Sequence, residues 1–362
     1  MSTIELRRIT KRFGSFTAVR DVDLSVAAGE VVCLLGPSGC GKTTTLRIIA
    51  GLERASGGDV IIAGRRMNKL KPEQRDIAMV FQFYALYPAL TVRENIMFPL
   101  YRERLSAAAA KARVNRVADL LHLQGVLDRR PGQISEGEKQ RVAVARAVVR
   151  DPNCFLFDEP LSRLDVELRQ SMRGQIKSVL TDLSKATVIV THDQLEALTM
   201  SDRIAIMRDG VIEQVAPPHE VFAKPVNVFV ASFIGTPQMN LLEADFGGME
   251  DGKASFNVEG NALRLRVDPA VQRLPEGKVT IGIRPRALMP DSAASPEALT
   301  SRAELIEPMG AETLVHARTG TGRDIRVVVP REARVKSGEM LHLRTDVSQV
   351  HVFDADGRAV RT

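Results

Sequence analysis

The sequence predicts an α/β core over residues 1–235 followed by a small all-β domain over residues 236–362. In the first part, short runs of Val, Ile and Leu alternate with helical stretches, which is typical of a mostly parallel sheet covered by helices. After residue 237, short alternating runs such as 279–283 and 324–329 are broken by Gly, Pro and Asp, as in a β domain. A chain of 362 residues can hold two domains, because single cores stop growing near about 250 to 300 residues.

The elements of the first part follow in chain order from these patterns. A helix is expected over residues 44–51, directly after an apolar strand. Between residues 92 and 150 the strand pattern disappears and an Ala-rich, charged helical pattern replaces it, which predicts a helical insertion over about 88–150. The expected strands cover residues 3–8, 31–35, 59–62, 77–81, 154–158, 187–191 and 204–208.

The composition is that of a globular protein, with 44% hydrophobic and 26% charged residues. The longest apolar runs are strand-sized, whereas a membrane-spanning helix needs about 20 apolar residues. Residues 1–6 show no basic region followed by an apolar core, so we expect a cytoplasmic protein. The formal charge is +6, but the basic residues are scattered, so nucleic acid is not an expected partner. Without metal-like spacing, the three cysteines are expected to be buried or reduced thiols: Cys33, Cys40 and Cys154.

A phosphate-binding loop is predicted at residues 36–43, which read Gly-Pro-Ser-Gly-Cys-Gly-Lys-Thr between an apolar strand and a helix. In this pattern, backbone N–H groups surround a nucleotide's β-phosphate and the helix N-terminus favours negative charge. Lys42 is expected to reach the β- and γ-phosphate oxygens, and the Thr43 hydroxyl to ligate Mg²⁺. The expected nucleotide-binding residues here are Gly36, Ser38, Gly39, Cys40, Gly41, Lys42, Thr43 and Thr44.

Polar side chains follow three of the predicted strands. Asp158 and Glu159 end a Phe-rich strand, where a pair of carboxylates is costly without a cation. Asp158 would hold Mg²⁺ through water, and Glu159 would act as general base on the attacking water. Gln82 would touch the metal and the attacking water, and His192 the γ-phosphate. Singly, Gln82 and His192 would more often be satisfied polar residues at strand ends, but together with the loop they favour a hydrolytic site.

The segment 135–141, Ser-Glu-Gly-Glu-Lys-Gln-Arg, completes a set of motifs by which the chain resembles the ATPase subunits of ATP-binding-cassette (ABC) transporters. It is most similar to the subunits that drive bacterial carbohydrate importers of the maltose and glycerol-phosphate type. The resemblance covers essentially the whole chain and implies a RecA-like P-loop ATPase core with a helical subdomain, plus an OB-like β domain. Its further marks are Tyr-Ala-Leu-Tyr-Pro at 84–88, Ser-Arg-Leu-Asp at 162–165, Thr-His-Asp at 191–193 and Gly-Ile-Arg-Pro at 282–285.

The resemblance also implies a head-to-tail pair of ATPase subunits with each ATP between one phosphate loop and the partner's signature helix. Ser135, Gly137 and Glu138 would then contact the partner's nucleotide. Phe13 would stack on adenine, although it could instead be a core residue of the first β-hairpin. Asp165 would link the two sites. Residues 83–98 would receive a short helix from each of two membrane permease subunits.

The signature departs from the usual Leu-Ser-Gly-Gly-Gln, because residues 134–138 read Ile-Ser-Glu-Gly-Glu. Glu136 places a negative charge near the partner's γ-phosphate, so we expect it to point away or to be compensated, with Arg163 as a candidate across the interface. Ser135 and Glu138 also form an S-x-x-E capping box, which would stabilise the helix start without ATP. Arg286 stands where the family commonly has Glu. These departures leave two options, a homodimer, which we favour, and a heterodimer with a second ATPase.

The resemblance implies an ATP hydrolase, with ATP and Mg²⁺ as cofactors, that drives uptake of a carbohydrate, polyol or glycerol derivative. It would lie peripherally at the cytoplasmic face of the inner membrane, with an extracytoplasmic solute-binding protein as an indirect partner. The β domain would stabilise the dimer and receive regulators. Import of polyamine or sulfate is the alternative, although residues 84–88 and 237–242 favour the sugar group. A soluble cassette ATPase acting on nucleic acid or ribosomes is more remote, since two cassettes, a coiled coil or zinc cysteines would be expected.

Overall fold

The computed structural model describes residues 2–103, 105–250, 253–266, 277–291 and 298–360. The chain divides into two compact units, Met1–Pro218 and His219–Thr362. The sequence placed the domain boundary later, at residues 235 and 236. The difference concerns the segment with helices α7 (Pro218–Ala223) and α8 (Val228–Phe233). Ala231 in α8 packs against Met239 and Phe353, so α8 shares a core with the β strands that follow it.

The first unit is built around a six-stranded sheet of order β10-β9-β3-β8-β7-β6. Its pairings are parallel except for β10, which is antiparallel to β9. Every residue of β3 and β8 is buried, which explains why these strands read as continuous apolar runs. The strands are β3 (Val31–Leu35), β6 (Ile77–Val80), β7 (Cys154–Asp158), β8 (Ala186–Thr191), β9 (Arg203–Arg208) and β10 (Val211–Ala216).

A second, antiparallel sheet of order β2-β1-β4-β5 belongs to the same unit. The predicted strands 3–8 and 59–62 lie here and not in the parallel sheet. The sequence pattern missed β2 because its buried and exposed residues alternate, so it contains no continuous apolar run. The bounds are β1 (Ser2–Phe13), β2 (Phe16–Ala27), β4 (Gly57–Ile62) and β5 (Arg65–Arg66).

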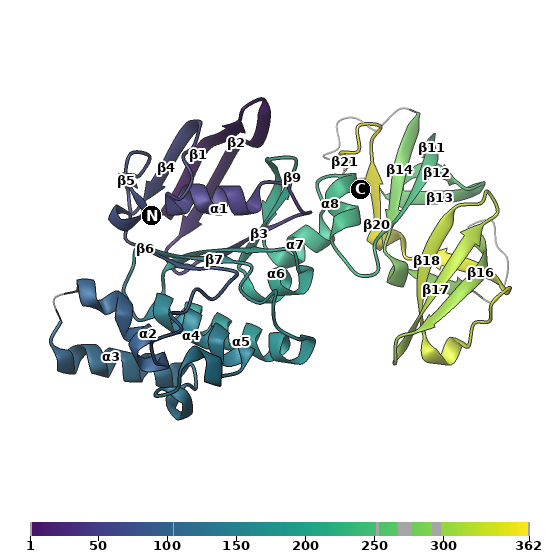
Figure 1. Cartoon of the computed structure of the whole chain (residues 1–362). Coiled ribbons are helices and arrows are strands. Elements are labelled where there is room, and N and C mark those ends of the chain that lie inside the picture. The colour runs from purple at the N-terminus through teal and green to yellow at the C-terminus, as the bar shows by residue number, and fades with distance from the viewer. Residues whose placement is uncertain (1, 104, 251–252, 267–276, 292–297, 361–362) are drawn as a thin grey trace. The chain divides into compact units, whose positions relative to one another are not determined.

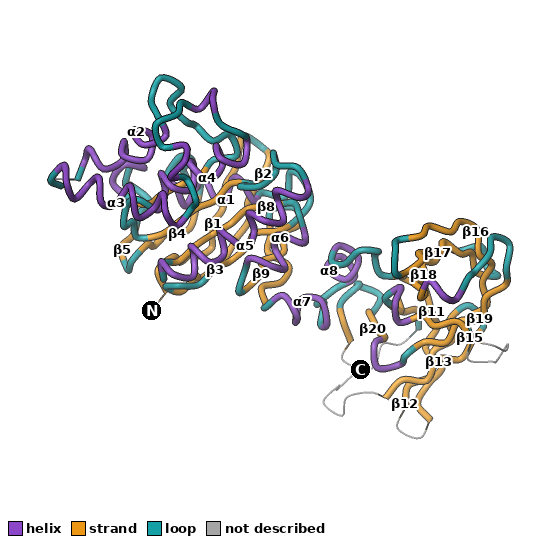
Figure 2. Tube along the Cα trace, turned by 90° about the horizontal axis from the view of Figure 1, so that it is seen from below, coloured by secondary structure: helices purple, strands orange, loops and turns teal. Residues whose placement is uncertain are grey.

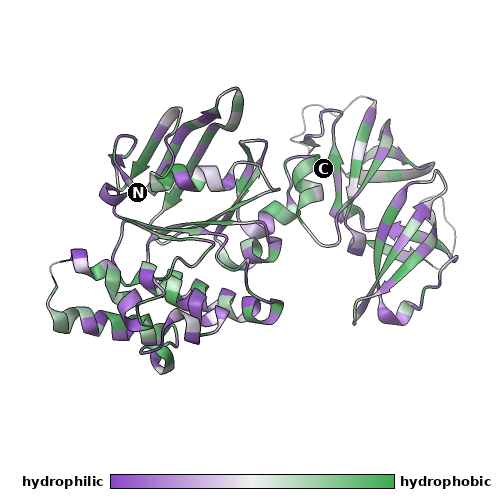
Figure 3. Ribbon diagram, in the orientation of Figure 1, coloured by the Kyte–Doolittle hydropathy of each residue, from purple (hydrophilic) through white to green (hydrophobic). Residues whose placement is uncertain are grey.

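Helices cover the parallel sheet on one face, and α1 with the antiparallel sheet covers the other (Figure 1). Side chains of β7 alternate between the two cores: Phe155 and Phe157 pack with the helices, whereas Cys154 and Leu156 pack with α1 and β1. The helices carry both hydrophobic and hydrophilic segments, as expected of elements buried on one side (Figure 3). They are α1 (Lys42–Ala50), α2 (Val92–Met97), α3 (Ala107–Leu120), α4 (Glu136–Val148), α5 (Val166–Leu183) and α6 (Gln194–Met200). The predicted helical insertion is confirmed by α2, α3 and α4.

The second unit contains two antiparallel sheets of order β13-β12-β11-β14-β20-β21 and β15-β19-β16-β17-β18, which confirms the small β domain (Figure 2). Both sheets contribute to one apolar core. The first sheet comprises β11 (Asn240–Glu250), β12 (Lys253–Val258), β13 (Asn261–Arg266), β14 (Lys278–Ile283), β20 (Val350–Phe353) and β21 (Ala359–Val360). The second comprises β15 (Leu288–Asp291), β16 (Leu299–Pro308), β17 (Glu312–Thr319), β18 (Asp324–Pro330) and β19 (Met340–Thr345).

Arg284 joins α7 and α8 to the end of β14 within this unit. Its guanidinium donates hydrogen bonds to the carbonyl oxygens of Phe222 and Ile234. Burial lowers the pKa of Arg284 to about 10. Arg286 stands where the resemblance led us to expect a Glu. Its Nε donates to Glu312 Oε1 at 2.9 Å, and its Nη2 donates to Glu312 Oε2 at 2.7 Å. Across the described part of both units, no helix has the length and apolarity needed to cross a membrane.

Candidate active site

The predicted phosphate loop connects β3 to α1 in a conformation that depends on glycine. Gly41 precedes α1 with a left-handed φ of 103°, and no side chain caps the helix N-terminus. A Cβ at Gly36 would lie 2.2 Å from the Met207 carbonyl oxygen, and one at Gly41 would lie 2.5 Å from the Ala18 carbonyl oxygen. Backbone N–H groups at an uncapped helix start are free to bind an anion. Ser38 and Gly39 form the exposed tip of the loop, and Thr43 and Thr44 lie in the first turn of α1.

Lys42 is buried and its ammonium group turns back into the loop. Its Nζ donates to the carbonyl oxygens of Gly36 at 2.7 Å and Pro37 at 2.9 Å. Cys40 Sγ lies 3.7 Å away. A phosphate bound in the loop would offer the same ammonium a charged acceptor, which makes a stronger hydrogen bond than a neutral carbonyl.

All three cysteines are free and buried, as predicted. Burial raises the pKa of Cys154 to about 12 and also raises the pKa of Cys33 and Cys40. Thiols with raised pKa values are poor nucleophiles at neutral pH. No nucleophilic role for these cysteines follows from the site.

Two carboxylates and a hydroxyl meet where β7 ends. Thr43 Oγ1 lies 3.5 Å from Asp158 Oδ1. Burial, together with the neighbouring Glu159 charge, raises the pKa of Asp158. A site that disfavours the ionised carboxylate gains stability when a cation arrives. Within the described ranges, no group of three or more His, Cys, Asp or Glu side chains is arranged to hold a metal ion.

The Glu159 carboxylate is held between the other two predicted catalytic residues. Gln82 Nε2 donates to Glu159 Oε2 at 2.9 Å, and His192 Nδ1 lies 3.3 Å from Glu159 Oε1. Glu159 itself has a left-handed φ of 47°, a strained conformation for a non-glycine residue. The structure therefore brings together three side chains that follow three different strands. Gln82 contacts the predicted base here, and its contact with a metal remains a prediction.

Ser162 belongs to the same hydrogen-bond network, although the sequence reasoning gave it no role. Its hydroxyl donates to the Glu159 carbonyl oxygen at 3.1 Å and lies 3.5 Å from Gln82 Nε2. Its position three residues after Glu159 was a sequence signal, because a Ser at this spacing can close a turn onto the backbone.

The signature segment forms the start of α4, with Ser135 as its N-cap. Glu138 accepts hydrogen bonds from the Ser135 backbone at 2.7 Å and hydroxyl at 2.8 Å, and the Ser135 hydroxyl accepts from the Glu138 N–H. The predicted capping box is confirmed. A Cβ at Gly137 would lie 2.6 Å from Leu168 Cδ2, so a larger residue there would require the Leu168 side chain on α5 to shift.

Glu136 is compensated by cations of its own chain. Lys139 Nζ lies 2.6 Å from Glu136 Oε1, and this hydrogen bond is the main cause of the lowered pKa of Glu136. Arg163, expected to compensate Glu136 from across an interface, also lowers its pKa from within the same chain. The sequence had suggested Arg163 from the sign of its charge alone. Lys139, three positions after Glu136 on the same helix, is the nearer cation. Burial and the Glu136 carboxylate raise the pKa of Tyr84 to about 12.

Phe13 and Asp165 occupy positions consistent with contacts outside the single chain. Phe13 is 48% exposed at the end of β1, and Lys11 Nζ lies 4.5 Å from its ring centroid. This exposure counts against the alternative that Phe13 is a core residue of the first β-hairpin. Asp165 caps α5 by accepting a hydrogen bond from the Leu168 N–H at 2.9 Å. In one chain, Asp165 therefore acts as a helix cap.

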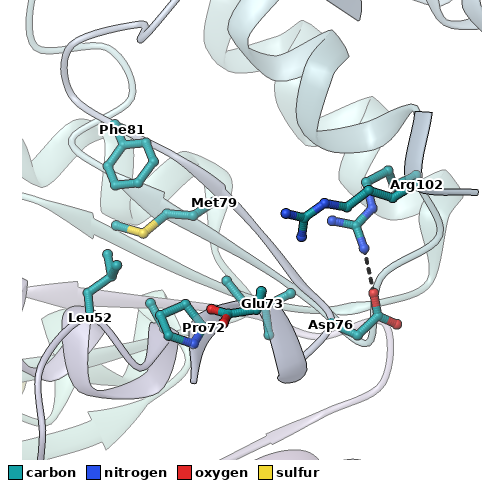
Figure 4. Close-up of a pocket in the computed structure, with 10 residues that line it drawn as sticks. Leu52, Pro72, Glu73, Asp76, Met79, Phe81 and Arg102 are labelled. Atoms are coloured by element: carbon teal, nitrogen blue, oxygen red, sulfur yellow. Dashed lines mark hydrogen bonds and ion pairs between the residues drawn. The ribbon is translucent and has the colours of Figure 1, made fainter. Parts of the chain in front are cut away.

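A cleft of about 390 Å³ is lined in part by Phe81, the residue directly before Gln82. Figure 4 shows the apolar side chains of Leu52, Met79 and Phe81 on one side of it, and Asp76 and Arg102 on the other. Arg150 pairs with Asp76 at 2.7 Å. The sequence had pointed to residues 83–98 for contact with membrane subunits. The cleft was missed because its lining comes from separated segments. The lining residues are Ala50, Leu52, Pro72, Glu73, Asp76, Ile77, Met79, Phe81, Arg102 and Arg150.

Exposed aromatic side chains form a cluster within the predicted segment and just after it. The ring centroids of Tyr87 and Phe98 are 4.4 Å apart, and those of Phe98 and Tyr101 are 5.9 Å apart. Their exposed fractions are 39%, 41% and 69% for Tyr87, Phe98 and Tyr101. Aromatic residues are enriched at protein interfaces relative to the rest of the protein surface.

Comparisons with known proteins identify two domain families in the chain. Residues 19–162 match the ABC transporter family and residues 281–353 match the TOBE domain. The chain is 44% identical to the sulfoquinovosyl glycerol transport ATP-binding protein of Agrobacterium fabrum, over 98% of both chains. It is 43% identical to an sn-glycerol-3-phosphate import ATP-binding protein of Rhizobium johnstonii, over 99% of this chain and 96% of the relative. A dimeric ATP-binding cassette, solved in a post-hydrolysis state with ADP and phosphate, is 33% identical with a TM-score of 0.53, covering 59% of this chain and 98% of that one.

Proposed function

Because the chain belongs to the ABC transporter family, as an ATP-hydrolysing subunit of an importer, we propose that it powers uptake of a glycerol derivative or a related carbohydrate or polyol. The two relatives described above are named for sulfoquinovosyl glycerol transport and for sn-glycerol-3-phosphate import. Both compounds carry a glycerol unit and a negative charge. These names support a glycerol-containing solute over the polyamine alternative.

The observation that carries the catalytic proposal is the Glu159 carboxylate held by Gln82 and His192 at the end of β7. In this proposal the phosphate loop and Lys42 bind the ATP phosphates. Glu159 accepts a proton from the water that attacks the γ-phosphate, the bond to the β-phosphate oxygen breaks, and ADP and phosphate form. His192 orients the γ-phosphate. A bound Mg²⁺ would neutralise phosphate charge, and Thr43, Asp158 through water, and Gln82 are its proposed ligands.

We propose that two ATPase subunits share each nucleotide. Ser135, Gly137 and Glu138 at the start of α4 would contact the ATP held by the partner's phosphate loop. Phe13 would stack on adenine, and Asp165 would contact the partner's site. The dimeric cassette among the similar structures supports pairing, and a homodimer needs no second kind of subunit.

We also propose that each of two membrane permease subunits places a short helix against the cleft and the aromatic cluster Tyr87, Phe98 and Tyr101. An apolar cleft of about 390 Å³ with a charged rim suits an amphipathic helix. The chain would then lie at the cytoplasmic face of the inner membrane. The solute would reach the permeases from an extracytoplasmic binding protein.

Uptake by cells with and without this chain tests the proposal. Labelled sn-glycerol 3-phosphate, sulfoquinovosyl glycerol, maltose and spermidine are offered separately. We expect a glycerol-containing solute to enter only with the wild-type chain or with the matched control Lys71→Ala, and not with Lys42→Ala. If Lys42→Ala abolished uptake of spermidine and of no other solute, the result would support the polyamine alternative. Uptake of every solute without the chain would contradict an importer role.

A further inference from the structure

The segment that follows Gln82 is tied to the signature helix by one arginine. Arg146 lies near the C-terminal end of α4, and its guanidinium donates a hydrogen bond to the Ala85 carbonyl oxygen. The guanidinium carbon lies 4.8 Å from the centroid of the Tyr87 ring. Tyr87 in turn contacts Phe98 in the aromatic cluster. Arg146 therefore connects α4 to the surface proposed to receive a membrane subunit.

The local environment makes this connection specific for arginine. Burial lowers the pKa of Arg146, so its charge is partly removed from water and needs partners. A planar guanidinium can donate to a carbonyl and stack on an aromatic ring at the same time, whereas a lysine ammonium cannot do both equally well. Ala85, which accepts the hydrogen bond, has a left-handed φ of 51°. Such a backbone conformation persists when surrounding contacts hold it.

A second residue holds the same segment without involving α4. Asn95 is fully buried, accepts a hydrogen bond from the Tyr87 N–H at 2.8 Å, and donates to the Tyr87, Leu90 and Thr91 carbonyl oxygens. The turn from residue 87 to residue 91 is therefore closed by Asn95. The contacts of Arg146 are not needed to close that turn. They link the turn to α4.

The two ends of α4 make different contacts. Ser135 and Glu138 form the capping box at the N-terminal end, where the partner's nucleotide is proposed to bind. Arg146 is three turns farther along the same helix. A packed helix moves as a rigid element, so a displacement at one end is transmitted to the other.

We propose that Arg146 is a positioning residue that couples engagement of the partner's ATP at Ser135 and Glu138 to the arrangement of residues 83–98. The coupling runs through α4 to the Ala85 carbonyl and the Tyr87 ring. This inference rests on the proposed nucleotide and permease contacts, and it assigns to one side chain the link between them. Arg146 touches neither nucleotide nor reacting atoms.

Hydrogen exchange on the purified full-length chain tests the coupling without a membrane subunit. The Glu159→Gln background is used so that bound ATP persists. We expect Mg²⁺ and ATP to slow amide exchange in residues 135–141 and also to change it in residues 83–98. In Arg146→Gln the effect in residues 135–141 should persist, whereas the effect in residues 83–98 should fall by about tenfold. An equal ATP effect in residues 83–98 with and without Arg146 would overturn the inference, as would the lack of any such effect with Arg146 present.

Four further variants, three single and one double, separate coupling from loss of fold. Arg116→Gln removes an exposed arginine from α3 and should leave both effects intact. Arg146→Lys keeps the charge and should restore part of the effect in residues 83–98. Tyr87→Leu should lose the effect as Arg146→Gln does, and the double variant should be no worse than either single one. Additive losses would contradict a shared route.

Steady-state turnover gives the second readout. With otherwise wild-type sequence, Arg146→Gln should keep basal ATP hydrolysis within about twofold, while the stimulation by membrane subunits falls by about tenfold. Full stimulation in Arg146→Gln would reject the inference and leave the importer function intact. The absence of uptake by the wild-type chain would instead reject the proposed function.

Discussion

Lys139 donates a hydrogen bond to Glu136 at 2.6 Å within the first turn of the signature helix. A carboxylate at a helix N-terminus is favourable to the helix, but the same carboxylate repels an incoming phosphate. Lys139 places a positive charge beside it at the spacing that brings two helical side chains together. The unusual acid of this signature is therefore part of an ion pair.

Removing Lys139 should weaken ATP-driven pairing of subunits. Lys139→Gln leaves Glu136 without its nearest cation, so we expect the dimer dissociation constant in Mg²⁺ and ATP to rise by about three- to tenfold. Analytical ultracentrifugation in the Glu159→Gln background measures it. Glu136→Gly should tighten the dimer or raise hydrolysis, and the double variant should lose most of the Lys139→Gln defect. Equal dissociation constants for all variants would mean that Glu136 faces away from the nucleotide.

Glu159→Gln should lower steady-state ATP hydrolysis by at least about 100-fold, because a positioned general base contributes about 10²- to 10⁴-fold. The amide keeps the size of the side chain, so binding of a fluorescent ATP analogue should change little. Glu167→Gln, in the first turn of α5, is the matched control and should retain full activity. Hydrolysis within a few-fold of wild type in Glu159→Gln would show that another group accepts the proton.

Asp158→Asn should stabilise the nucleotide-free chain at neutral pH and reduce the additional stability gained with Mg²⁺ and ATP. A carboxyl group with a raised pKa favours folding below its unfolded pKa, and that contribution is lost as pH rises through its folded pKa. Once ionised, Asp158 therefore lowers the free energy of unfolding until a cation binds. Differential scanning calorimetry with and without Mg²⁺ and ATP measures both effects, with Asp182→Asn as the control. A lower nucleotide-free Tm in Asp158→Asn would contradict the prediction.

The second unit should lose stability in acid because of His351. Burial, assisted by Arg284, lowers the pKa of His351 to about 4. A histidine with a lowered pKa contributes stability above its unfolded pKa of about 6.5, and that contribution disappears as pH falls toward about 4. Urea unfolding of wild type, followed by a probe in the β sheets, should show this loss between those two values. His351→Gln should flatten the dependence, whereas the exposed His219→Gln should not. An unchanged slope in His351→Gln would assign the acid sensitivity to another group.

Much of the fold was predictable because its central strands are buried on both faces and therefore appear as continuous apolar runs. β3 and β7 were predicted at the bounds that the structure has. β2 and β10 were missed, because a half-buried strand breaks such a run. The helix-rich insertion and the β domain followed from changes in pattern. The earlier boundary of the second unit, at residues 218 and 219, could not be foreseen, since it depends on contacts of Arg284 with α7 and α8 across many residues of sequence.

The meeting of Gln82, Glu159 and His192 was also predictable, because parallel strands end at the same edge of a sheet. The direction in which each of these side chains points could not be predicted from the sequence. Lys139 as the partner of Glu136, and Arg146 as the partner of Tyr87, depend on helix packing that no linear motif records. Whether the assigned residues perform their predicted roles stays a prediction.

The position of β3 between β8 and β9 has a consequence for synthesis on the ribosome. Val31 pairs with Thr187, and Val32 pairs with Arg203, so both neighbours of this strand are made much later. The β1–β2 hairpin can form as soon as it emerges, but β3 must wait for most of the first unit. Until then its apolar side chains have no sheet to enter, and nascent chains ending before residue 203 should depend on chaperones and bind no nucleotide.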